Sequence, residues 1–204
     1  VTIFTMAPES GKEIVRKALA MGADDAVMLS DAQLEGSDVA GTAHAMAAAL
    51  KKNGFDLILC GTQSTDAITG EVPGFLAELL GVPGLTYVRK LESDGTTIKA
   101  QRETDTGYID VSASTPALVS VTKAINEPRY PSLKGIMGAK KKEIRVLSLA
   151  DVEFTRAAGT SGAKTELLEL AAPPTRQKGR VVTAADGSEG ASAIFDFLKE
   201  KKLV

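Results

Sequence analysis

The sequence predicts an α/β fold in which a parallel sheet carries an antiparallel extension and a C-terminal arm. Three observations support this prediction. In the first half, short apolar runs alternate with helical patterns, as in right-handed βαβ units. Residues 85–114 then hold three β-prone runs separated by turn residues, which is typical of an antiparallel meander. Beyond residue 150 the chain becomes rich in Ala, Gly, Thr and Lys and loses its periodicity.

The bulk properties exclude several classes of protein. At 204 residues the chain suits one large domain, or one domain with a tail. A net charge of −2 argues against a nucleic-acid binder, which usually carries a basic excess. No apolar run reaches the roughly 18 residues of a membrane span, so we expect no membrane insertion. A single cysteine, Cys60, excludes an internal disulfide and suits a reducing compartment.

The first strand is predicted at residues 1–6, directly at the start of the sequence. A domain that opens on such a strand has lost what preceded it, or it begins at a processing boundary; both interpretations stay open. Glu9 and Ser10 suit the first turn of a helix, where they meet unpaired amides and the helix dipole. Apolar residues then recur on one helical face until Gly22 ends the helix.

The next elements continue the alternation. Residues 26–29 form a second predicted strand, and Ser37 or Asp38 caps an alanine-rich helix over residues 40–52. The remaining elements are predicted as strands at 55–60, 85–91, 97–103, 108–114, 116–121 and 144–149, and as helices at about 70–80 and at 191–203.

Residues 1–150 are therefore predicted to form one α/β domain, and residues 151–204 an extended arm with a terminal helix. Residues 155–190 hold a long irregular stretch, which compact domains rarely tolerate. It is either disordered or lies along another surface. The terminal helix places Ile194, Phe195 and Leu198 on one side, which indicates docking on a partner chain.

The strongest local signal for a binding site is the loop 61–70, which follows an apolar strand and precedes a helix. In open α/β sheets, ligands bind at such loops beyond the carboxyl ends of strands. Amides at residues 69–72, with the hydroxyl groups of Ser64, Thr65 and Thr69, suit a phosphate. An ordinary polar loop with Thr69 as a helix cap explains the same residues, and both readings stay open. The loop is neither a Walker A motif nor a GxGxxG motif.

The case for an enzyme is poor. His44 is the sole histidine and lies within a predicted helix, so a zinc site is improbable. Cys60 at a strand end suits a small core residue rather than a nucleophile. Neither Ser64 nor Ser132 belongs to a GxSxG elbow. We expect no catalytic residues and no metal.

The segment 126–142 is predicted to be a protein-docking loop. Pro128 and Pro131 favour an extended, exposed backbone. It presents apolar side chains followed by a basic triplet, a combination in which an anchor fills a pocket while charges steer the encounter. The candidate docking residues are Tyr130, Leu133, Ile136, Met137 and Lys140.

This segment closely resembles the recognition segment of electron-transfer flavoprotein beta subunits. Other runs are similar to that family in the same order: residues 16–24, 56–61 with 69–70, and 102–117. The resemblance implies an adenine-nucleotide α-hydrolase-like (Rossmann-like) fold. It also implies that further nucleotide contacts come from family residues ahead of the segment that opens here. The cofactor-binding positions implied are Met6, Ala7, Gly61, Ser64, Thr65, Asp66, Ala67, Ile68 and Thr69.

The resemblance also implies a function. The chain would bind AMP structurally and pair with an alpha subunit that holds the redox-active FAD. Acyl-CoA or related flavoprotein dehydrogenases would donate electrons, as in fatty acid oxidation, with Leu133 as the docking anchor. A quinone-linked acceptor would then take those electrons. The expected location is the cytoplasm of a bacterium, or the mitochondrial matrix in a eukaryote.

Two alternatives remain. Bifurcating relatives bind a second FAD in place of AMP, usually with a Gly-Asp-Thr-Ala-Gln-like run that is missing here. A stand-alone nucleotide-binding module that resembles universal stress proteins shares the broad fold, but it leaves the 126–142 segment and the arm unexplained.

Overall fold

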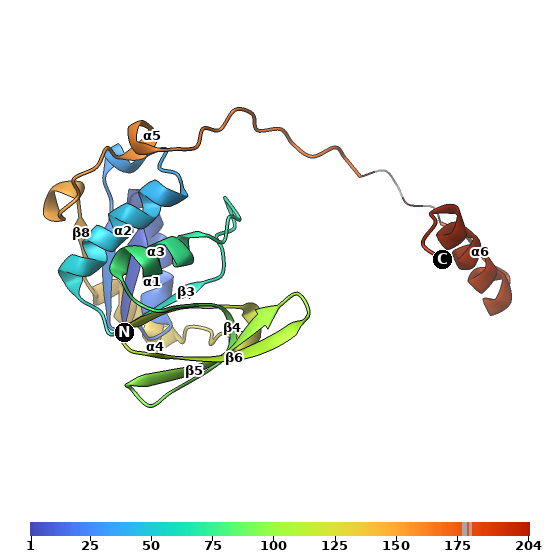
Figure 1. The fold of residues 1–204 in the computed structure, drawn as a ribbon, viewed down its shortest axis with the longest axis horizontal. Coiled ribbons are helices and arrows are strands. Elements are labelled where there is room, and N and C mark those ends of the chain that lie inside the picture. Colours follow the sequence, from blue (N-terminus) through green and yellow to red (C-terminus); the bar gives the residue numbers. More distant parts are fainter. Residues whose placement is uncertain (177–178, 180) are drawn as a thin grey trace. The chain divides into compact units, whose positions relative to one another are not determined.

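The computed structural model describes residues 1–176, 179 and 181–204. The chain divides into two compact units, residues 1–166 and 167–204, both traced in Figure 1. The first unit holds all the strands and five of the helices of the described chain, and the second holds one helix.

A fully parallel sheet of three strands combines two strands from the start of the first unit with one from near its end. It contains β1 (Thr2–Met6), β2 (Asp25–Leu29) and β8 (Ile144–Leu147), in the order β1-β2-β8. In register, Phe4 lies opposite Val27, which in turn lies opposite Arg145. β2 is the central strand, and Met28 and Leu29 on it are fully buried.

A second sheet has five strands in the order β3-β7-β4-β5-β6. Strands β3 (Leu57–Gly61), β7 (Ala117–Val121) and the start of β4 (Gly84–Ser93) run parallel. Strands β5 (Thr97–Thr104) and β6 (Gly107–Ser114) continue from β4 as an antiparallel meander. These pairings confirm the α/β prediction with an antiparallel extension, although the parallel strands divide between two sheets.

Helices α2 (Val39–Asn53) and α3 (Val72–Leu80) lie side by side in Figure 1 and pack against each other. Alanines on the buried face of α2 allow this close approach. The contact between the helices includes Ala47, Leu50 and Leu76, which also meet Leu118 of β7. Helix α1 (Lys12–Ala20) packs against α4 (Leu133–Lys141), and α5 (Gly159–Gly162) is a single short turn.

Two predicted helix starts are confirmed in position, whereas a third differs from the structure. Asp38 caps α2, because its Oδ1 accepts a hydrogen bond of 2.8 Å from the Gly41 amide. The helical segment predicted to start at Glu9 and Ser10 does start there, as a 3-10 turn over Glu9–Gly11 that leads directly into α1, although no side chain caps it. Helix α3 begins at Val72 without a capping side chain, so the reading of Thr69 as its cap is wrong.

The predicted extended loop at residues 126–142 is wrong in its second half, which is helix α4. Ser132 caps this helix by accepting a 3.0 Å hydrogen bond from the Gly135 amide. Pro131 directly precedes that cap, where an extended backbone suits a helix start. The prolines therefore indicate an extended backbone only before the helix, and not over the whole segment. The missing side chain of Gly135 lets α4 approach α1, since a Cβ there would lie 2.4 Å from the carbonyl oxygen of Ala20.

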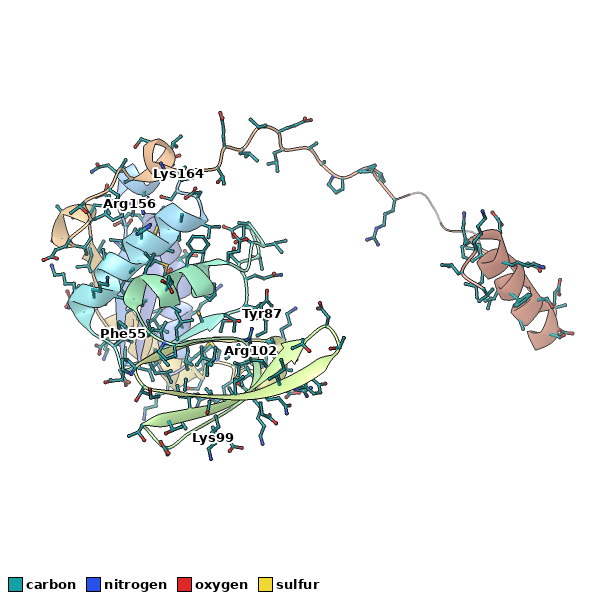
Figure 2. All side chains as sticks on the ribbon, in the orientation of Figure 1. Phe55, Tyr87, Lys99, Arg102, Arg156 and Lys164 are labelled. Atoms are coloured by element: carbon teal, nitrogen blue, oxygen red, sulfur yellow. The ribbon has the colours of Figure 1, made fainter. Side chains whose placement is uncertain are left out.

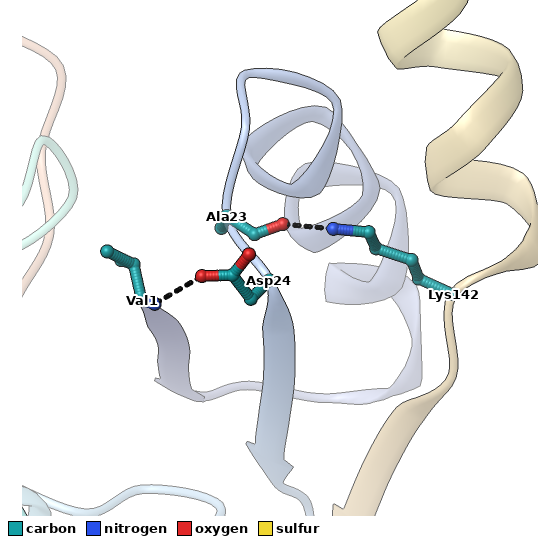
Figure 3. A network of polar contacts seen from close by, with 4 residues as sticks. All are labelled: Val1, Ala23, Asp24 and Lys142. Atoms are coloured by element: carbon teal, nitrogen blue, oxygen red, sulfur yellow. Dashed lines mark hydrogen bonds and ion pairs between the residues drawn. The ribbon is translucent and has the colours of Figure 1, made fainter.

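Polar contacts also hold the end of α4 against the start of β2. Figure 3 shows Lys142 Nζ, which donates a 2.5 Å hydrogen bond to the carbonyl oxygen of Ala23. Beside it, the Val1 ammonium group lies 2.5 Å from the Asp24 carboxylate. Arg16 of α1 donates to the carbonyl oxygens of Ala139 and Lys142. The C-terminal end of α4 is thus fastened to α1 and to the residues before β2.

The second unit contains helix α6 (Gly187–Glu200), which starts four residues before the predicted helix at 191–203. Asp186 caps it by accepting a 2.9 Å hydrogen bond from the Glu189 amide. Ile194, Phe195 and Phe197 are exposed on it. Residues 167–176 form neither helix nor strand, but the irregular stretch predicted at 155–190 includes residues 177, 178 and 180, which lie outside the described residues.

We expect the stability of the first unit to fall below neutral pH because of His44. Burial, followed by the charges of Arg156 and Lys51, lowers the pKa of His44, whose Nε2 contacts the Arg156 guanidinium group. The unfolded chain therefore binds a proton more readily, so stability is lost as the pH falls through about 6.5, the ordinary pKa of histidine.

The measurement is the melting temperature at pH 8 and at pH 5.5, in the natural protein and in His44→Gln. The melting temperature of the natural protein should fall more between pH 8 and pH 5.5 than that of the variant. Asp31, Asp38 and Asp151, whose pKa values are lowered by hydrogen bonds from Gln33, Gly41 and Ser148 respectively, stay charged in this window. Equal losses would assign the pH dependence to other groups.

Candidate functional site

A cavity of about 690 Å³ opens beyond the carboxyl ends of two parallel strands, β1 and β3. Met6 ends β1, Gly61 ends β3, and both line the cavity. The first turns of α2 and α3 form further parts of its wall, through Val39, Thr42, Val72 and Pro73. The cavity therefore meets two helix N-termini, whose free amides and dipoles favour an anion.

The structure brings most of the sequence-predicted ligand residues to this cavity. Six of the nine line it: Met6, Gly61, Ser64, Asp66, Ala67 and Thr69. The other three, Ala7, Thr65 and Ile68, do not belong to the lining. Ile68 is exposed and has a left-handed backbone with a φ of 53°, so the loop turns sharply just before Thr69.

Sequence reasoning missed the wall that α2 contributes. Ser37, Asp38, Thr42 and Met46 line the cavity together with Thr165, which is more than one hundred residues away in sequence. Asp38 was recognised only as a helix cap, yet a cap at the N-terminus of a helix that follows a parallel strand is itself a signal for a site. No sequence signal pointed to Thr165.

Asp38 also joins the N-terminus of α2 to residues 164 and 165 at the cavity. Its Oδ2 accepts hydrogen bonds from the amides of Lys164 and Thr165, at 2.6 and 3.2 Å. The bonds from Gly41 and Lys164 lower the pKa of this carboxyl group. The segment before the second unit is thus attached to the rim of the cavity.

The cavity carries no positive side chain among the described residues that line it. Its two carboxylates, Asp38 and Asp66, are already engaged in hydrogen bonds. The bond from the Ser64 hydroxyl, followed by that from the Ala67 amide, lowers the pKa of Asp66. A phosphate here would therefore be held by backbone amides, hydroxyl groups and helix dipoles, and not by lysine or arginine.

The candidate catalytic groups are not arranged for chemistry. Burial raises the pKa of the Cys60 thiol to about 11, so it stays protonated and unreactive near neutral pH. Ser64 lines the cavity, whereas Ser132 caps α4 and does not belong to the lining. Within the described residues, no group of three or more His, Cys, Asp or Glu side chains is placed to hold a metal ion. In the same residues no helix combines the length and apolarity needed to cross a bilayer.

The apolar docking candidates on α4 and just before it are exposed, and we call them together the α4 surface: Tyr130, Leu133, Ile136 and Met137. Tyr130 is 96% exposed, Leu133 81% and Met137 69%. Leu133, Ile136 and Met137 lie at the i, i+3 and i+4 positions of α4 and so share one helical face. Lys140 and Lys141 follow in the last turn of this helix. Ala139, by contrast, is buried and packs with residues of α1, which holds the helix on the domain.

Residues 1–152 match the family model described as the electron transfer flavoprotein domain. The match covers the two sheets, the cavity loops and the α4 surface.

The chain belongs to the electron transfer flavoprotein family.

Its similarity to beta subunits of this family extends over the whole chain. It is 44% identical to the electron transfer flavoprotein subunit beta of Mycobacterium tuberculosis (strain ATCC 25618 / H37Rv), over 100% of this chain and 77% of that protein. It is 40% identical to the subunit beta of Megasphaera elsdenii, over 98% of this chain and 77% of that protein. It is 32% identical to the caffeyl-CoA reductase-Etf complex subunit CarD of Acetobacterium woodii, over 100% of this chain and 79% of that protein.

Membership confirms the resemblance predicted from the 126–142 segment. An electron transfer flavoprotein beta subunit is an electron-transfer protein rather than a catalytic enzyme, and it has at least one partner subunit. The assembly is a flavoprotein, so a flavin belongs to the complex.

Proposed function

We propose that this chain is the nucleotide-stabilised docking subunit of a heterodimeric electron carrier. It binds AMP in the cavity between α2 and α3, and it presents the α4 surface to acyl-CoA or related flavoprotein dehydrogenases. Electrons pass through FAD in the alpha subunit to a quinone-linked acceptor, and this chain does no covalent chemistry. The observation that carries the proposal is a cavity lined by two helix N-termini in a member of this family.

The character of the cavity supports a monophosphate. Amides, hydroxyl groups and helix dipoles can hold one phosphate group by hydrogen bonds, whereas a longer phosphate chain calls for cations, which the described lining does not provide. The apolar part of the wall, with Met6, Met46 and Leu76, suits a planar base. Both features support AMP and its position.

Residues 151–204 are proposed to pack on the alpha subunit as an arm. Ile194, Phe195 and Phe197 on α6 support this, because exposed apolar side chains on a helix need a surface to cover them. The proposed location remains the bacterial cytoplasm, which is supported by a free Cys60 and by the bacterial sources of the relatives described above.

Release and chromatography of the bound nucleotides test the cofactor assignment. Full-length protein, purified together with its alpha subunit, should release AMP and FAD in equal amounts. Two FAD molecules per heterodimer and no AMP would contradict the AMP assignment. That outcome would instead support the alternative of a bifurcating-type subunit with its own FAD. A chain that is stable without any partner would favour the stand-alone module.

The docking role predicts a selective kinetic defect in Leu133→Ala. The exposed leucine is available as an anchor, and removing an interface anchor costs about 2 kcal/mol or more, which corresponds to roughly thirtyfold. We expect the KM for a donor dehydrogenase to rise by about this factor, while the flavin spectrum and the melting temperature stay unchanged.

The matched control is Ile14→Ala, which shortens another exposed aliphatic side chain, on α1. It should leave the KM unchanged. An equal rise in both variants, or no rise in Leu133→Ala, would contradict the docking role of the α4 surface.

A further inference from the structure

Tyr87 has a backbone conformation that bulky residues rarely adopt. It lies within β4 with a φ of 57°, in the left-handed region that normally favours glycine. The pairing of β4 with β7 shifts its register between Leu85 and Val88, so Tyr87 belongs to a β-bulge. Strained residues of this kind persist only where their surroundings over-determine them, and they cluster at functional sites.

Neighbouring strands hold this bulge from two sides. The Tyr87 amide donates a 3.2 Å hydrogen bond to Oγ of Ser120, a residue of β7 that is 1% exposed. Arg102 of β5 donates from Nε to the carbonyl oxygen of Thr86, at 2.8 Å, and from Nη2 to the Thr86 hydroxyl, at 3.0 Å. Figure 2 labels Tyr87 and Arg102 at this place. The conformation is therefore built into the sheet.

The hydroxyl group of Tyr87 lies against the end of the cavity loop. A Cβ placed on Gly70 would be 3.3 Å from that hydroxyl oxygen and 3.7 Å from the carbonyl oxygen of Thr62. Gly70 has a φ of 68° and lines the cavity. Thr62, near the start of the loop, donates from its hydroxyl to the carbonyl oxygen of Val121, at 2.9 Å.

Gly70 is thus enclosed between the first residues of its own loop and Tyr87. Both supports are attached to β7, Tyr87 through Ser120 and Thr62 through Val121. Strand β7 therefore fixes the position at which the loop 61–70 ends. It thereby also fixes the direction of the backbone amides at the start of α3. Tyr87 itself is not part of the cavity lining, so any effect on a ligand passes through Gly70.

We propose that Tyr87 is a positioning residue for the ligand loop: its hydroxyl group, held by the bulge, fixes Gly70 so that the loop keeps its phosphate-binding form before a ligand arrives. This role rests on the proposed nucleotide binding. It assigns a purpose to the strained backbone, since an ordinary φ at residue 87 would direct the side chain away from Gly70. Preorganisation of this kind raises affinity because less freedom is lost on binding.

Tyr87→Phe tests the role by removing only the hydroxyl group. The experiment uses the full-length chain with its alpha subunit, stripped of nucleotide and titrated with AMP in a calorimeter. We expect AMP affinity to fall by about threefold to tenfold, because a loop that is less ordered beforehand loses more freedom on binding. Amide hydrogen exchange of residues 62–70 should become faster without ligand, while the melting temperature stays unchanged. Tyr108→Phe, another exposed tyrosine whose ring meets Arg89, is the matched control.

A double-mutant cycle with Gly70→Ala adds a second measure. The new methyl group meets the Tyr87 hydroxyl, so Tyr87→Phe should weaken AMP binding less in that background than in the natural protein. If Tyr87→Phe matches Tyr108→Phe in affinity and in exchange, the positioning role is overturned while AMP binding stands. If the natural protein binds no AMP, the proposed function fails, and the exchange of residues 62–70 still decides whether Tyr87 holds the loop.

Discussion

Thr69→Glu is expected to weaken AMP binding about a hundredfold. Thr69 lines the cavity beside the start of α3, and no positive side chain belongs to the described lining. A new carboxylate about 5 Å from a phosphate, at an effective dielectric constant near 20, repels it by about 3 kcal/mol. A difference of 1.4 kcal/mol changes a dissociation constant tenfold, so the expected loss is roughly two orders of magnitude.

The control for this variant is Thr65→Glu. Thr65 belongs to the same exposed loop but does not line the cavity. The variant therefore adds the same negative charge to the loop, but outside the proposed phosphate site. Calorimetric titration of the nucleotide-free heterodimer measures both affinities. Equal losses would mean that only the general charge of the loop matters, and no loss in Thr69→Glu would remove the phosphate from this end of the cavity.

Leu118→Ala is expected to cost the first unit about 2–5 kcal/mol of unfolding free energy. Leu118 is fully buried on β7, between β3 and β4, where it meets the helix pair α2 and α3. Shortening it leaves a hole that close-packed neighbours fill only in part. For a unit of this size, such a loss lowers the melting temperature by about 10 °C.

Leu133→Ala provides the comparison, because the same three carbon atoms are removed from a side chain that is 81% exposed. Its cost should stay within about 0.5 kcal/mol. Urea unfolding of both proteins measures the difference. If the two variants unfolded alike, β7 would not carry the core of the second sheet.

The pattern of strands was the most predictable part of the fold, and helix starts were the least. Buried strands such as residues 25–29 can be recognised in the sequence as apolar runs, because both faces of a parallel sheet are covered. Helix α4 escaped prediction because its own residues favour a helix only weakly. Gly135 and Gly138 lower helix propensity, and the Ser132 cap together with the packing of α4 on α1 offsets them.

The candidate site, too, could be predicted from the sequence only in part. The loop 61–70 is continuous in sequence, so its position after a strand could be read directly. The bulge at Tyr87 and the attachment of Thr165 to Asp38 both depend on residues that meet only in the folded chain. No local pattern encodes a left-handed tyrosine, since the hydrogen bonds that impose it come from β5 and β7.

The low reactivity of the Cys60 thiol has a practical consequence for spectroscopy. With a pKa of about 11 and partial burial, it reacts slowly with maleimides at neutral pH, and the sequence contains no other cysteine. A cysteine introduced at Ser192, an exposed residue of α6 outside the apolar face of Ile194, Phe195 and Phe197, can therefore be labelled with a dye or a spin probe without first removing Cys60. A second label on the partner subunit would then report, by energy transfer, when the arm engages.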